Sequence, residues 1–87
     1  MTDITETTVY ATASKALRAL LRLEDDAIIT REIMYRTADQ DLQFKLALHY
    51  LEICQEIKKA ERHYAHTTAN LIVACRVLGK PITLPAA

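Results

Sequence analysis

Three histidines and a glutamate are the residues whose types and spacing could bind a metal ion. His63 and His66 stand three residues apart, close enough on a helix to share one ion, and Glu56 precedes His63 by seven residues. At 100° per residue the same side of that helix also carries other polar residues, namely Asp41, Lys45, His49, Glu52, Lys59 and Asn70. Because this side lies opposite the apolar stripe, we expect a solvated face. A metal site at Glu56, His63 and His66 is the weaker alternative, and no cofactor is expected.

Three charged residues fall inside stripes that are otherwise apolar. Glu61 lies between Ile57 and Tyr64, while Glu24 and Arg31 stand seven residues apart nearer the N-terminus. Charged side chains are rarely buried alone, and a polar residue at a core position often fixes register and oligomeric state. We expect this role for Glu61, with Arg31 as a candidate partner. Exposure at an interface rim is the second interpretation, and a catalytic carboxylate is the third, because no second group completes an active site.

The cysteines and tyrosines have structural interpretations. Cys54 and Cys75 are 21 residues apart, which is about 31 Å on a single helix and too far for a disulfide. We expect them to be inert core residues in a reducing cytoplasm. Four tyrosines on or near the stripes are expected to pack in a core or interface: Tyr10, Tyr35, Tyr50 and Tyr64. Without a phosphate loop or zinc-ligand spacing, nothing in the sequence favours an enzyme.

A strip of basic residues lies on the side of the N-terminal helical segment away from its apolar stripe: Lys15, Arg18, Arg22 and Arg36. Such a strip could contact phosphates, but Asp25, Asp26 and Glu32 share the same side. The chain has 11 basic and 11 acidic residues, whereas non-specific nucleic-acid binders usually carry a positive surplus. A solvated face is therefore favoured, and a dimeric nucleic-acid-binding regulator is kept as the alternative.

The elements that position these residues are predicted to be helices. One Gly and two Pro in 87 residues leave little material for tight turns, while helix-forming residues dominate. A chain of this length forms one domain at most. Its longest wholly apolar run, Leu71 to Cys75, is too short to cross a bilayer, so no membrane partner is expected. Met1 to Thr8 lacks the features of a signal peptide.

The spacing of apolar residues predicts a long antiparallel helical hairpin, with helices over about residues 4–36 and 39–78. Asp3 followed by Glu6, and Thr37 followed by Gln40, are each typical of a capping box at a helix start.

The end of the second helix is marked by Gly79 and Pro81. A minority alternative has three helices, with a break near residues 24–26, where acidic residues could begin a new helix. In either case, residues 1–80 are expected to form a single helical domain, and residues 81–87 a short flexible tail.

Both stripes are too wide for two helices to cover. The remaining apolar area is expected to be buried by a second copy, giving a four-helix bundle with coiled-coil-like packing, or by another protein. The expected anchors are Leu17, Leu20, Leu21, Tyr50, Ile57, Tyr64 and Leu71, with Glu61, Arg31 and Glu24 setting specificity. We predict a non-enzymatic interaction module, such as an adaptor, chaperone or regulator. In size and hairpin shape the chain resembles the small co-chaperones of bacterial type III secretion needles and the dimeric hairpin RNA-binding regulators of plasmid copy number.

Overall fold

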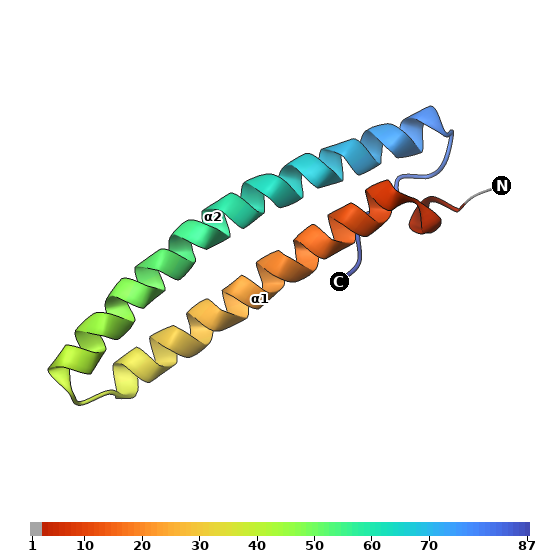
Figure 1. The fold of residues 1–87 in the computed structure, drawn as a ribbon. Coiled ribbons are helices and arrows are strands. Elements are labelled where there is room, and N and C mark those ends of the chain that lie inside the picture. The colour runs from red at the N-terminus through yellow and green to blue at the C-terminus, as the bar shows by residue number, and fades with distance from the viewer. Residues whose placement is uncertain (1–2) are drawn as a thin grey trace.

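The computed structural model describes residues 3–87 and consists of two long antiparallel helices (Figure 1). A short 3-10 helix, η1 (Ile4–Glu6), precedes α1 (Thr8–Arg36) and α2 (Gln40–Val77). The predicted all-α hairpin is confirmed, and no strand occurs within the described residues. Because α1 runs through residues 24–26 without interruption, the three-helix alternative is wrong.

The first helix begins later than the sequence predicts. The predicted start at residue 4 corresponds to η1, and α1 begins only at Thr8. Thr7 has an extended backbone, and its Oγ1 accepts a hydrogen bond from the Tyr10 N–H at 3.2 Å. Asp3 instead caps η1, accepting from the Thr5 N–H at 3.2 Å. Thr is itself a favoured N-cap, so Thr7 competes with Asp3 for the helix start.

The turn between the helices lies where the sequence predicts it, but its cap is different. Asp39 is the N-cap of α2, and its Oδ1 accepts from the N–H groups of Asp41 at 2.9 Å and Leu42 at 3.2 Å. Thr37 ends α1, and its hydroxyl donates to the Ile33 carbonyl at 2.6 Å. The capping box predicted at Thr37 is therefore wrong. A carboxylate next to the helix N-terminus also interacts favourably with the helix dipole.

The end of α2 follows the predicted signal. Gly79 adopts φ +66, and its N–H donates to the Arg76 carbonyl at 3.2 Å, while the Lys80 N–H donates to the Cys75 carbonyl at 2.9 Å. This pair of bonds is the Schellman arrangement, in which a left-handed residue satisfies the last carbonyls of a helix. The helix itself ends at Val77, one residue before the predicted limit.

The hydrophobic core is thin and is best developed at the open end of the hairpin. Ile4, Ala13, Leu71 and Cys75 form a buried cluster there. Two helices can bury only the stripes that face each other, so a third element is needed to widen the core. At the open end that element includes η1, which contributes Ile4.

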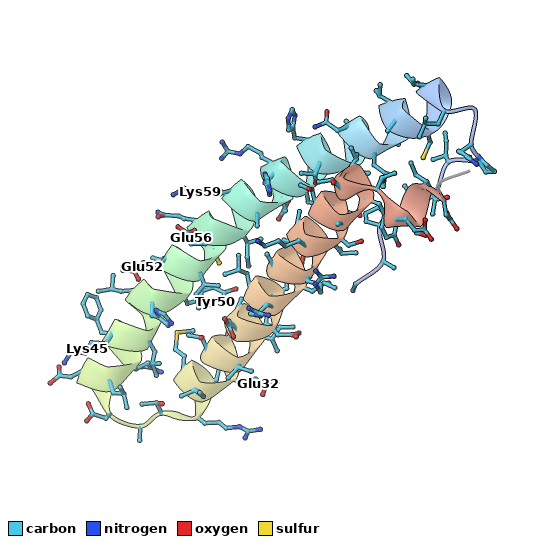
Figure 2. All side chains as sticks on the ribbon, turned by 45° about the vertical axis from the view of Figure 1, so that its right-hand side comes forward. Glu32, Lys45, Tyr50, Glu52, Glu56 and Lys59 are labelled. Atoms are coloured by element: carbon cyan, nitrogen blue, oxygen red, sulfur yellow. The ribbon has the colours of Figure 1, made fainter. Side chains whose placement is uncertain are left out.

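The segment after α2 turns back along the N-terminal part of α1, as both views show (Figures 1 and 2). It forms neither helix nor strand, yet its Pro85 is buried. Ser14, which lies on α1 to one side of the contact with α2, is also buried, which fits a tail that covers this side. The flexibility expected for residues 81–87 stays a prediction.

Candidate interaction surface

The helices meet along one seam that divides the surface of the hairpin into two sides. The buried residues of the seam follow a seven-residue repeat made of steps of three and four residues. They are Ala13, Ala16, Leu20, Ala27 and Thr30 in α1 and Ile53, Thr67 and Leu71 in α2. In an antiparallel pair, residues that hold the same position of the repeat on the two helices lie on the same side of the seam. The position of a residue in the repeat therefore tells on which side of the seam it lies.

One side carries a row of exposed apolar side chains at spacings of seven residues. They are Leu21, Ile28 and Tyr35 on α1 and Phe44 and Leu51 on α2, with exposed fractions of 40%, 47%, 74%, 65% and 58%. Tyr35 and Phe44 line the same open hollow beside the turn, which places the two rows on one side. We call these five residues the closed-end patch.

Toward the open end of the hairpin, two residues on the same side are buried. Ser14 continues the row of Leu21, Ile28 and Tyr35 by one step of seven, and it is buried. Cys75, also on this side of α2, is buried in the cluster that includes Ile4 of η1. The closed-end patch is therefore the part of one continuous side that η1 and the returning tail do not reach.

The opposite side is mixed in character. Ile29, Ile33 and Leu42 are exposed there near the turn. Farther along α2 the surface becomes polar, and Figure 2 shows Lys45, Glu52, Glu56 and Lys59 along the outer edge of the helix. This polar edge agrees with the solvated face expected from the sequence.

The histidines lie on this polar surface and are all exposed. His49 Nδ1 lies 3.8 Å from a Glu52 carboxylate oxygen, and Lys59 Nζ lies 3.4 Å from one of Glu56. Within residues 3–87, no three His, Cys, Asp or Glu side chains group closely enough to hold a metal ion. Glu56, His63 and His66 are thus not brought together as a set of metal ligands.

The predicted anchors divide into three groups. Leu20 and Leu71 are buried between the two helices. Half-buried positions along the seam are occupied by Leu17, Tyr50, Ile57 and Tyr64, and Tyr50 points toward the space between the helices in Figure 2. Only Leu21 belongs to the closed-end patch. Phe44 and Leu51 were not among the predicted anchors, although their spacing of seven residues was a usable signal.

The three charged residues expected to set specificity are exposed in the hairpin. Glu61 lines a shallow hollow on α2 together with Lys58, Arg62 and Ala65. Glu24 and Arg31 are exposed on α1, next to the closed-end patch. Within a single hairpin they bury no charge, so their role in specificity stays a prediction.

The cysteines and the basic strip do not come together in one site. Cys54 is half-buried and Cys75 is buried, and both thiols are free. The basic strip is exposed on α1 at Lys15, Arg18, Arg22 and Arg36, and the exposed acids Asp25, Asp26 and Glu32 lie between Arg22 and Arg36. These acids offset part of the positive charge of the strip, and the nucleic-acid alternative stays a prediction. In the described part of the chain, neither helix has the length and apolar character needed to span a membrane.

No family model, curated protein or solved structure matches the chain. Its function therefore has to be argued from the surface of the hairpin.

Proposed function

We propose that this protein is a small, non-enzymatic protein–protein interaction module that binds through the closed-end patch. The observation that carries the proposal is the row of five exposed, large apolar side chains on one side of the hairpin. Such a module acts as an adaptor, chaperone or regulator by capturing another protein chain on a preformed helical surface.

The energetics of the patch support this function. At roughly 200 Å² for a fully exposed side chain of this size, the five residues expose about 600 Å² of largely apolar surface. That is the upper end of the largest patch found on typical monomers, and such patches often mark binding sites. Burying each side chain stabilises a complex by about 1–3 kcal/mol. Tyr35 and Phe44 are the most exposed members and the strongest anchors, because aromatic residues dominate binding energy at interfaces.

A capture experiment with matched variants tests the proposal. The wild-type chain, Phe44→Asp and Val73→Asp are immobilised separately and exposed to an extract of the native cell. Val73 is the control because it is 57% exposed, close to the 65% of Phe44, but lies on α2 near the open end. We expect a stoichiometric protein, either a second copy or another chain, to be retained by the wild type and Val73→Asp. Phe44→Asp should lose it. Equal retention by all three, or no retained protein at all, would refute the proposal.

A further inference from the structure

We infer that the closed-end patch binds a second copy of this chain, with the two hairpins face to face and their closed ends pointing in opposite directions. This inference rests on the proposed function and names its partner. The two-fold axis would pass between the Ile28 and Leu51 side chains of the two copies. Three observations carry it: the register of the helices, the arrangement of charge around the patch, and the surface that is available.

The register of the helices fixes which patch residues lie at the same level. Tyr35 and Phe44 line one hollow near the turn, and Thr12 and Thr67 line another near the open end. Because the helices are antiparallel, moving seven residues toward the N-terminus from Tyr35 and seven toward the C-terminus from Phe44 brings Ile28 beside Leu51. Ile28 and Leu51 therefore form the centre of the patch.

The same register places Leu21 beside Lys58 at one edge of the patch. Tyr35 and Phe44 form the opposite edge, also seven residues from the centre along each helix. In the antiparallel dimer, Leu21 would contact the partner's Tyr35. Lys58 would lie at the level of the partner's Phe44, where its ammonium group can interact with the aromatic ring.

Two charged residues beside the patch favour one of the two ways in which the hairpins can stack, with their closed ends in opposite directions or in the same direction. Glu24 and Arg31 flank Ile28, four residues before it and three after it. Neither makes an ion pair with another side chain in residues 3–87. With the closed ends in opposite directions, each Glu24 lies within one residue of the level of an Arg31 on the other copy. The interface therefore contains two complementary pairs, as a two-fold contact requires.

Stacking with both closed ends in the same direction loses this complementarity. In that arrangement α1 lies over the partner's α2 at the same level. Arg31 would then lie at the level of Leu48 and Glu24 at the level of Gln55, so that each charged group would lose water without gaining a partner of opposite charge. The antiparallel arrangement is therefore favoured.

The available surface matches the size of a dimer interface. The patch supplies about 600 Å² of apolar surface, and the adjoining charged side chains bring each copy near the roughly 800 Å² typical of a stable interface. Toward the open end, Ser14 and Cys75 on the same side are buried, and Ile4 of η1 belongs to the cluster that contains Cys75. The contact is thus confined to the closed halves of the hairpins.

Neighbouring isoleucines provide a matched test. Ile28 and Ile29 are 47% and 54% exposed, but they lie on opposite sides of the hairpin. Sedimentation or light scattering over a concentration series should show a dimer for the wild type and for Ile29→Asp. Ile28→Asp would place two carboxylates together at the axis and should weaken the dimer by roughly 100-fold. Circular dichroism should show equal helicity for all three proteins. Equal dimerisation of the two variants would overturn the inferred interface.

Charge reversal tests the orientation of the dimer. Glu24→Arg or Arg31→Glu alone creates two like-charged contacts and should weaken the dimer by roughly 10-fold or more. The double variant restores opposite charges and should recover the wild-type affinity. Two single variants with wild-type affinity, or a double variant with additive losses, would contradict the antiparallel arrangement.

The outcomes separate this inference from the proposed function. A folded wild-type protein that stays monomeric, while its capture of another chain still depends on Phe44, would overturn self-association alone. Failure of both self-association and capture would overturn both proposals.

Discussion

Two buried hydroxyl groups differ in whether they have a hydrogen-bond partner. Ser14 Oγ is buried without a partner among the described residues. Thr67 is equally buried, but its hydroxyl donates to the Tyr64 carbonyl at 3.0 Å. A buried polar group that makes no hydrogen bond lowers stability, whereas one that is bonded contributes modestly. The two residues should therefore respond in opposite ways to loss of the hydroxyl.

Ser14→Ala should increase the free energy of unfolding by about 1 kcal/mol, and Thr67→Ala should decrease it by about 1 kcal/mol. Both substitutions also raise helix propensity, so the difference between the variants reports the hydroxyl groups. Urea unfolding monitored by circular dichroism measures the change, with Ile28→Asp as the background to keep dimerisation out of the transition. A loss of stability in Ser14→Ala as large as that in Thr67→Ala would show that the Ser14 hydroxyl is satisfied.

At the residue scale, the sequence predicts the backbone conformation at a helix end better than it predicts the burial of a side chain. Gly79 was expected to end α2 because a left-handed residue there favours glycine, and the observed φ of +66 confirms it. Glu61 lies within an apolar stripe of the sequence and is exposed in the single hairpin, so its expected place at an interface stays a prediction. The local signal depends only on neighbouring residues. The burial of Glu61 depends on whether a further element covers its side of the seam, and periodicity alone carries no such information.

At the element scale, the cap of α2 depends on one carboxylate. Asp39 Oδ1 accepts two backbone hydrogen bonds at the start of the helix, from residues 41 and 42. Gln43 of the first turn also donates its side-chain N–H to the Met34 carbonyl of α1 at 3.2 Å. Asp39 therefore stabilises the start of α2, and Gln43 joins the first turn of α2 to the end of α1.

Asp39→Ala should lower the free energy of unfolding by about 1 kcal/mol, because two helix N–H groups lose their acceptor. Asp39→Asn keeps an acceptor oxygen and should cost only a few tenths of that amount. Thermal unfolding of the two variants beside Asp25→Ala, an exposed mid-helix acid, measures the difference. A loss in Asp25→Ala equal to that in Asp39→Ala would point to a general charge effect rather than to the cap.

The elements themselves follow from composition and periodicity, while their exact starts do not. A chain with so little Gly and Pro has few places to break a helix, so two long helices and one turn were predictable. The start of α1 was not, because Asp3 and Thr7 are both good caps, and the choice depends on η1 packing Ile4 into the core. Likewise, Phe44 and Leu51 could be assigned to a surface only once the register between the helices was known.

At the scale of the whole molecule, the hairpin is too elongated to bury its apolar surface alone. Its radius of gyration is 17.7 Å, compared with about 12 Å for a compact domain of this length. An elongated pair of helices presents two outer sides along its whole length. In this chain, η1 packs Ile4 into the core at the open end and the tail runs back along the N-terminal part of α1, whereas nothing within the described residues covers the closed half of this side.

The orientation inferred for the dimer predicts its length. One hairpin is 59 Å long, and its closed end lies about 15 Å beyond the level of Ile28 at 1.5 Å per residue. Two hairpins with opposed closed ends overlap only over the patch, so the dimer should be about 90 Å long. Hairpins stacked with both closed ends in the same direction would keep a length of about 60 Å. Small-angle scattering of the wild-type dimer, with Ile28→Asp as the monomer control, distinguishes these lengths. A maximum dimension near 60 Å for a particle of twice the monomer mass would contradict the antiparallel arrangement while leaving self-association in place.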